Sequence, residues 1–207
     1  IFLNDSMAQE KKLRILAAGD LHGDSELAKK LAEKAEKENV DLVVLLGDIH
    51  GQTESKGLIY PFKKIGKKVV FVPGNWDTTL EANTLTEIYG ITNLDAKYAI
   101  YDDVGILGVG NPNFQMNIDE SKSIKKLREN FGKVKTRKRI LISHLHAKNT
   151  RAEFSGIKGS KALRQAIDEF QPDLFLSAHI HEAEGLEEKI GKTTLINVGR
   201  KGKIIEI

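Results

Sequence analysis

The sequence predicts an α/β protein with mixed rather than all-parallel sheets. Short apolar runs of strand length alternate with stretches of helical spacing from residue 13 onward, which is typical of βαβ units. Near the C-terminal end, short apolar segments separated by Gly-Lys and Lys-Gly pairs predict antiparallel strands instead. No low-complexity tract or linker divides the 207 residues. We therefore expect one domain over residues 7–207, with residues 1–6 (IFLNDS) as a tag remnant or loose extension.

The first part of the chain predicts three strands that alternate with helices. Residues 13–18 (LRILAA) and 42–46 (LVVLL) are continuous apolar runs suited to buried strands, and residues 25–39 between them have helical spacing. A weak helix at 59–65 and a strand at 69–72 continue the alternation.

The second part predicts more elements of both kinds. The expected helices are 81–89, 121–130 and 160–170, the last with Ser160 as its N-cap. The expected strands are 98–100, 105–109, 140–143 and 173–177. Three last strands, at 186–190, 193–198 and 203–207, are expected to form antiparallel hairpins.

Composition excludes several kinds of chemistry. Hydrophobic residues make up 40% of the chain, which is enough for a sizeable core. No run approaches the roughly 18 apolar residues of a membrane helix, and no signal peptide is recognisable, so we expect a soluble, cytoplasmic protein. The absence of cysteine excludes disulfides, thiolate metal sites and a cysteine nucleophile.

The basic charge of the chain is local. Nine Lys and Arg residues lie between Lys122 and Arg139 against one acid, Glu129, and the remainder has 23 basic against 28 acidic residues. Such a run can bind nucleic acid. However, Lys135 and its neighbours enter the strand predicted at 140–143 roughly 16 Å from its far end. A solvated helical face is the favoured interpretation, and a nucleic-acid partner is possible but not favoured.

Polar residues with metal-ligating side chains follow five of the predicted strands. The motif GD-x-HG occurs twice, at 19–23 and 47–51. The residues are Asp20 and His22, Asp48 and His50, Asn75 and Asp77, His144 and His146, and His179 and His181. Because parallel strands bring their carboxyl ends to one edge, we expect all six histidines of the chain to converge there.

This set of donors predicts a metal centre. Carboxylate, amide and imidazole ligands without thiols suit Mn, Fe, Zn, Ni or Co. One catalytic ion with open positions would use fewer ligands than the seven candidate donors, which are Asp20, His22, Asp48, Asn75, His144, His179 and His181. They favour two divalent ions that share one carboxylate, at a separation of roughly 3.5–4 Å.

The motifs resemble the calcineurin-like metallophosphoesterase family, in particular its small bacterial and archaeal phosphodiesterases. They are GD-x-H at Asp20 and His22, GD at Asp48, GN-x-D from Asn75, SH at His144 and H-x-H at His179 and His181. The resemblance implies a four-layer αββα sandwich with two mixed sheets flanked by helices. It also implies ligands for two ions: Asp20, His22 and His181 for the first, Asn75, His144 and His179 for the second, with Asp48 bridging.

By this resemblance the chain is a binuclear metal-dependent phosphoesterase. A hydroxide held between the ions would attack phosphorus in line, because even one ion can lower the pKa of a bound water to about 7. Trp76 stands where much of the family has a histidine thought to protonate the leaving group. His50 and His146 are candidates to supply that proton, and Asp77 is a further candidate helper. Ala178 replaces a usual glycine.

Two loops leave the predicted site edge, at 111–119 and 147–159. In the second loop, Lys148 and Arg151 are candidates for phosphate binding. Asn75, outside these loops, is a further candidate. The leading hypothesis is hydrolysis of phosphodiesters or small phosphorylated substrates. One alternative is a non-catalytic metal-binding scaffold for protein partners, like the retromer subunit that shares this fold. The other is a nuclease of the same family.

Overall fold

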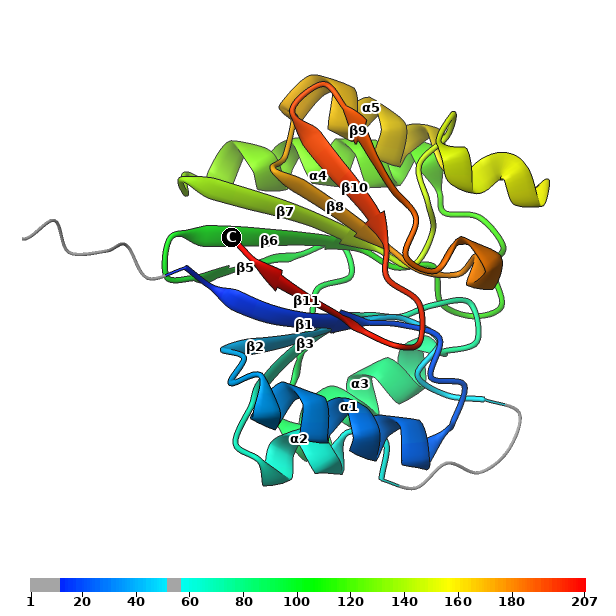
Figure 1. Cartoon of the computed structure of the whole chain (residues 1–207). Coiled ribbons are helices and arrows are strands. Elements are labelled where there is room, and N and C mark those ends of the chain that lie inside the picture. Colours follow the sequence, from blue (N-terminus) through cyan, green and yellow to red (C-terminus); the bar gives the residue numbers. More distant parts are fainter. Residues whose placement is uncertain (1–11, 52–56) are drawn as a thin grey trace, which may run out of the picture.

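The computed structural model describes residues 12–51 and 57–207, which form two β-sheets packed face to face between helices (Figure 1). The strand order is β11-β1-β2-β3-β4 in the first sheet and β5-β6-β7-β8-β10-β9 in the second. Helices α1, α2 and α3 cover the outer face of the first sheet, and α4 and α5 cover that of the second (Figure 1). This confirms the predicted αββα sandwich with two mixed sheets. The predicted extension at 1–6 lies outside the described residues.

The helices and strands have the following bounds. The strands are β1 (Arg14–Ala18), β2 (Leu42–Leu46), β3 (Lys68–Val72), β4 (Thr92–Asn93), β5 (Tyr98–Tyr101), β6 (Val104–Val109), β7 (Lys138–Ser143), β8 (Leu174–Ser177), β9 (Glu187–Ile190), β10 (Thr193–Asn197) and β11 (Lys203–Glu206). The helices are α1 (Ser25–Lys37), α2 (Tyr60–Lys64), α3 (Thr79–Tyr89), α4 (Glu120–Lys133) and α5 (Lys161–Phe170), with 3-10 turns η1 (Arg151–Ser155) and η2 (His181–Ala183).

The central strands are apolar throughout because both of their faces are covered. In β2, Val43 and Leu45 pack toward the helices on one side. Leu42, Val44 and Leu46 pack into the layer between the two sheets on the other. All five residues are buried, as expected for a parallel strand covered on both faces. The continuous run at 42–46 thus forms the middle of a sheet rather than part of a helix.

Helices α1, α3, α4 and α5 begin at residues whose polar side chains cap them, whereas α2 begins without a side-chain cap. Asp24 caps α1 by accepting a hydrogen bond from the Leu27 N–H at 2.9 Å. Ser160 caps α5 in the same way, with the Leu163 N–H as donor, which confirms the predicted cap. Among the residues that the structure describes, no helix combines the length and apolar character needed to cross a membrane.

The C-terminal strands differ in part from the prediction. Strands β9 and β10 form the expected antiparallel hairpin. Strand β11 does not pair with β10; it crosses to the first sheet and pairs antiparallel with β1. The two-residue strand β4 and the turns η1 and η2 were not predicted either. A strand's partner depends on packing between distant segments, and local turn residues do not encode it.

Candidate metal centre

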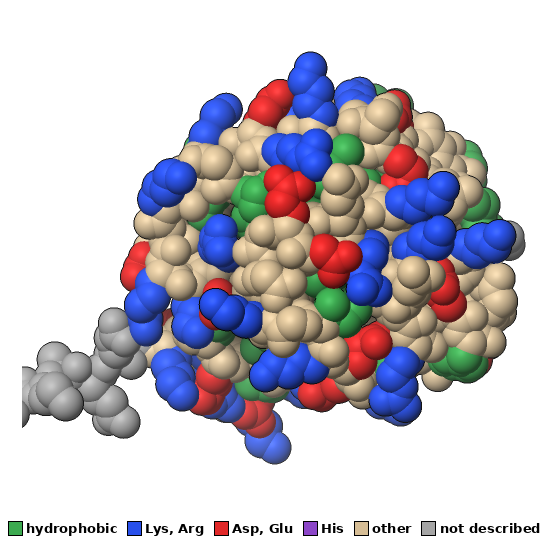
Figure 2. Space-filling model, turned by 90° about the horizontal axis from the view of Figure 1, so that it is seen from above, with side chains coloured by type: hydrophobic (Ala, Val, Ile, Leu, Met, Phe, Trp, Pro, Cys, Tyr) green, Lys and Arg blue, Asp and Glu red, His purple; other side chains and the backbone are tan. Residues whose placement is uncertain are grey.

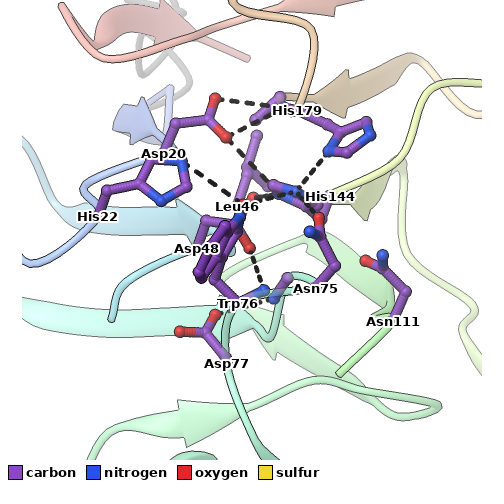
Figure 3. Close-up of polar contacts among 12 residues, drawn as sticks. Asp20, His22, Leu46, Asp48, Asn75, Trp76, Asp77, Asn111, His144 and His179 are labelled. Atoms are coloured by element: carbon purple, nitrogen blue, oxygen red, sulfur yellow. Dashed lines mark hydrogen bonds and ion pairs between the residues drawn. The ribbon is translucent and has the colours of Figure 1, made fainter. Parts of the chain in front are cut away.

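Five strands of the two sheets end at one common edge. Strands β1, β2 and β3 come from the first sheet, and β7 and β8 from the second. Figure 3 shows how side chains from both sheets meet beyond these strand ends. The sandwich therefore brings together residues that are up to about 160 positions apart, such as Asp20 and His179, whose N–H lies 3.2 Å from the Asp20 Oδ2.

One group of possible ligands consists of Asp20, His22 and His181. One ligand atom of each lies within 4.8 Å of the others. The His181 Nε2 is 3.6 Å from the Asp20 Oδ1, and the centroids of the His22 and His181 rings are 5.4 Å apart. Asp20 is buried while His181 is exposed, so this group opens toward solvent.

A second group consists of Asp48, His144 and His179, again with ligand atoms within 4.8 Å of one another. The His144 Nε2 lies 3.3 Å from the Asp48 Oδ2 and 3.0 Å from the His179 Nδ1. The Asn75 Oδ1 lies 3.1 Å from the same His144 nitrogen. The structure therefore contains two groups of side chains that can hold a metal ion, and Asn75 adjoins the second.

Asp48 lies between the two groups. Its Oδ2 is 3.6 Å from the His22 Nε2 on one side and 3.3 Å from the His144 Nε2 on the other. Its Oδ1 accepts a hydrogen bond from the Trp76 N–H at 2.9 Å, which fixes the carboxylate. Asp48 therefore adjoins both groups of possible ligands.

The polar atoms of the second group fit a cation. Three acceptors, on Asp48, Asn75 and His179, face the one Nε2 of His144, and a single N–H cannot satisfy all three. A divalent ion among these N and O donors would satisfy the acceptors that the one N–H leaves without a partner.

The backbone at this edge is strained, and its conformation sets the directions of the side chains of the possible ligands. Asp20, His22, Asp48 and His179 have φ angles of 55°, 46°, 50° and 67°. Such angles are uncommon outside glycine and occur at functional sites where surrounding contacts enforce them. Here the His22 N–H donates to the Asp48 carbonyl at 2.8 Å, which joins the two GD-x-HG turns.

Glycine allows these turns to lie in contact. A Cβ on Gly47 would lie 2.6 Å from the Gly74 N and 2.8 Å from the His144 Nδ1, and Gly47 has a φ of +81°. A Cβ on Gly74 would overlap the Asp48 carboxylate. Any side chain at either position would therefore displace a predicted ligand.

The electrostatics of the second group distinguish its two histidines. Burial lowers the pKa of His144, but the Asp48 carboxylate outweighs burial and raises the pKa to about 9. Burial and the neighbouring His144 charge lower the pKa of His179 to about 4. Burial opposes the charge of Asp48, yet its contact with His144 leaves the Asp48 pKa below the ordinary value. The Asp48 charge thus favours the protonated form of His144, whereas burial favours the neutral form of His179.

Two of the six histidines, His50 and His146, lie outside both groups of possible ligands. The His50 N–H and Nδ1 lie 2.9 and 3.1 Å from the Asp77 Oδ1, and the Asp77 Oδ2 accepts from the Gly74 N–H at 2.8 Å. Asp77 thus ties the His50 turn to the turn before Asn75. His146 is buried, and its Nε2 is 3.2 Å from the Ile157 carbonyl. The ligand geometry favours His144 over His146 in the HLH pair.

Two of the residues predicted to bind phosphate, Lys148 and Arg151, lie on the loop that follows β7. Lys148 borders a surface hollow over α5 together with Lys161 and Arg164. Arg151 begins η1, and its backbone N–H donates to the Glu188 carboxylate at 2.8 Å. A role for either residue in binding substrate stays a prediction.

The basic residues of α4 and β7 are interspersed with acids, as a solvated face would be. Figure 2, which views the molecule from the side of α4 and α5, shows Asp and Glu side chains among the Lys and Arg side chains. Arg128 pairs with Glu169 at 2.9 Å, and Lys138 pairs with Asp173 at 2.8 Å. These pairs reduce the positive field that a nucleic-acid partner would need, so that partner remains unfavoured.

Two residues near the site were missed by sequence reasoning. Arg200 donates from Nη1 to the Asp20 carbonyl at 3.0 Å and from Nη2 to the Asp24 Oδ2 at 2.8 Å. Asn111 is buried near Asn75 (Figure 3), and its Oδ1 has no hydrogen-bond partner. Asn111 is a polar residue just beyond the end of β6, so the rule that found the other residues could have found it. No comparable signal marks Arg200.

The fold is a two-sheet sandwich in which carboxylate and imidazole groups gather at one edge. The sequence pattern of the family described as "Calcineurin-like phosphoesterase" matches residues 13–183. The chain belongs to this family, which confirms the resemblance drawn from its motifs. A comparison with curated proteins gives no match.

Solved structures of low sequence identity share the fold. A Thermus thermophilus protein matches with a TM-score of 0.73 and 17% identity, over 95% of this chain and 99% of that one. A dimetal phosphatase from Danio rerio matches with a TM-score of 0.64 and 12% identity, over 92% and 88% of the two chains. An archaeal phosphodiesterase matches with a TM-score of 0.54 and 16% identity, over 94% and 99%.

Proposed function

We propose that this chain is a divalent-metal-dependent phosphoesterase that hydrolyses phosphodiesters or other small phosphorylated substrates. The position of Asp48 supports this most directly, because one carboxylate oxygen faces both groups of possible ligands, at 3.6 and 3.3 Å. Membership of the calcineurin-like phosphoesterase family supports the same class of reaction.

We assign the ligands as the motifs imply. Asp20, His22 and His181 would hold one ion, Asn75, His144 and His179 the other, and Asp48 would contact both. The N and O donors suit Mn, Fe, Zn, Ni or Co. When bound, two such ions would neutralise phosphoryl oxygens and lower the pKa of a water between them, which makes it a nucleophile near neutral pH.

The protein's own groups would orient this chemistry. The Trp76 N–H holds the Asp48 carboxylate at 2.9 Å. The Asn75 amide would contact a phosphoryl oxygen as well as an ion. For the proton of the leaving group we favour His50 over His146. The His50 side chain is 19% exposed and fixed by Asp77, whereas His146 is 2% exposed with its Nε2 near a carbonyl. Asp77 would act as a positioning residue.

The test is hydrolysis of bis-p-nitrophenyl phosphate and p-nitrophenyl phosphate with Mn²⁺, Ni²⁺, Mg²⁺ or a chelator. We expect metal-dependent cleavage of the diester by the wild type and a loss of at least about 100-fold in Asp48→Asn, because the amide removes the charge that faces both groups. Asp173→Asn makes the same chemical change at the start of β8, away from this edge, and should retain activity.

The result that overturns the proposal is an absence of turnover with every metal while the protein stays folded. If such a protein still bound two ions per chain, the scaffold alternative would replace it. Cleavage that Asp48→Asn leaves intact would show that the reaction occurs elsewhere.

A further inference from the structure

Three aromatic rings form a row from the predicted metal centre to the surface. The centroid of the Trp76 ring lies 6.0 Å from that of His22, a predicted ligand, and 6.3 Å from that of Phe114. Both pairs of rings are edge-on. Phe114 is 67% exposed. From this row we infer a subsite in which Trp76 and Phe114 bind a planar aromatic ring of the substrate, such as the base of a nucleoside phosphate. The inference rests on the proposed function and specifies its substrate.

The position of Trp76 is set by the same contacts that set the ligands. It lies between Asn75 and Asp77, and its N–H is bonded to the Asp48 carboxylate. This bond fixes the backbone from which the indole projects, and the indole itself lies edge-on to the rings of His22 and Phe114. A ring bound against it would be adjacent to a phosphate held at the metal centre.

Phe114 is held in place by backbone contacts with the Asn75 turn. Its N–H donates to the Asn75 carbonyl at 2.9 Å, and the Asn113 N–H donates to the Asp77 carbonyl at 2.9 Å. The Asn113 side chain also pairs with Thr79, whose N–H donates to Oδ1 and whose Oγ1 accepts from Nδ2, both at 2.9 Å. The loop is thus bonded to the segment that carries the predicted ligands.

These contacts keep an apolar ring in solvent at some cost. Asn113 and Phe114 have φ angles of 67° and 60°, and a bulky residue rarely adopts such a backbone. Phe114 buries little of its own surface, so packing in the core does not explain its position. Strain that holds an exposed aromatic side chain beside a site is expected where the ring contacts a ligand.

The chemistry of the row selects a planar, uncharged ring. Bases stack on exposed aromatic side chains of proteins, and their loss weakens binding by about tenfold or more. A phosphate group alone gains nothing from Trp76 and Phe114. Affinity should therefore depend on the ring, not only on the phosphate.

The test compares adenosine 5′-monophosphate with ribose 5-phosphate, which differ by the base alone. Affinities are measured by calorimetry with Zn²⁺ present. Trp76 is the single tryptophan of the chain, so its fluorescence reports on the ring directly. We expect adenosine 5′-monophosphate to bind about tenfold more tightly and to change Trp76 emission, and ribose 5-phosphate to leave it unchanged.

Two matched variants assign the effect to the row. Phe114→Leu should reduce the preference for the base to about threefold or less, because it removes one of the two stacking rings. Phe154→Leu makes the same change at a phenylalanine that is 65% exposed on η1, outside the row, and should keep the full preference.

Equal affinity for the two ligands, no binding of either, or a preference that Phe114→Leu leaves intact would each overturn the inference. The hydrolysis assay separates this failure from that of the proposed function. Metal-dependent turnover without preference for a ring would refute the subsite alone. A preference for the base without any turnover would refute the hydrolase alone.

Discussion

Arg200 joins the turn that carries Asp20 to the cap of α1. Its guanidinium donates to the Asp20 carbonyl and to Asp24, and its backbone N–H lies 3.1 Å from a Glu184 carboxylate oxygen. Because Asp20 has a strained backbone with a φ of 55°, this clamp helps to hold its carboxylate toward His22 and His181. Arg200 is therefore a positioning residue of the first group.

Replacing Arg200 by alanine should weaken binding of the ion at that group by about tenfold, as loss of groups that orient ligands does in other metal sites. Calorimetric titration with Zn²⁺ checks this, and thermal unfolding shows whether the fold persists. Arg164→Ala is a matched control, because Arg164 donates to Asp168 at 2.9 Å and to loop carbonyls beside α5. An Arg200→Ala protein with wild-type affinity would contradict the assigned role.

At the scale of residues, the sequence indicates possible ligands better than the residues that support them. Asp20, Asp48 and His144 were predicted because each follows an apolar strand, and they lie in the two groups of possible ligands. Arg200 acts on a backbone carbonyl, which any residue possesses, so no pattern pairs it with Asp20. Likewise His50 and His146 match the strand-end rule but lie outside both groups, because the rule does not fix where a side chain points.

At the scale of elements, the strands other than β4 were predicted from their apolar runs, and the order of the strands in the sheets was not. Strand β2 matches its predicted bounds because five apolar residues between turns leave no other assignment. Strand β11 was misassigned because it is as compatible locally with a hairpin as with its true partner β1. Strand β4 has two residues, too few for a periodic signal.

Asp173 fixes the junction where β7 and β8 begin. Partial burial opposes its charge, but hydrogen bonds from the Lys138 Nζ at 2.8 Å and the Arg139 N–H at 2.9 Å outweigh this, so the pKa of Asp173 is lowered. A lowered pKa means that folding favours the carboxylate. Its contribution is present above the ordinary pKa of about 3.9 and is lost as the pH falls through the lower value of the folded state.

Asp173→Asn should therefore lower the free energy of unfolding by about 1 kcal/mol at pH 7, a value discounted for partial exposure. The difference from wild type should shrink as the pH falls below about 4. Urea unfolding at a series of pH values measures both. Asp168→Asn removes an exposed pair on α5 and should change stability by less than about 0.5 kcal/mol. A cost for Asp173→Asn that does not vary with pH would refute the electrostatic explanation.

At the scale of the whole molecule, the packing of the two sheets brings the ends of their strands together at one edge. Each sheet supplies part of the predicted metal centre: Asp20, Asp48 and Asn75 follow strands of the first, and His144 and His179 follow strands of the second. The layer between the sheets is apolar, with Ile15, Val44 and Ile142 among its buried residues. Loss of packing there would separate the two halves of the site, so stability and metal binding should be coupled.

Seven residues that follow strands of both sheets are proposed to hold two ions. The most direct measurement is anomalous X-ray diffraction from crystals of the wild-type protein grown with Mn²⁺. We predict two anomalous peaks roughly 3.5–4 Å apart, one bound by Asp20, His22 and His181 and the other by Asn75, His144 and His179, with Asp48 in contact with both. A single peak, or peaks bound by His50 or His146 in place of these residues, would contradict the account.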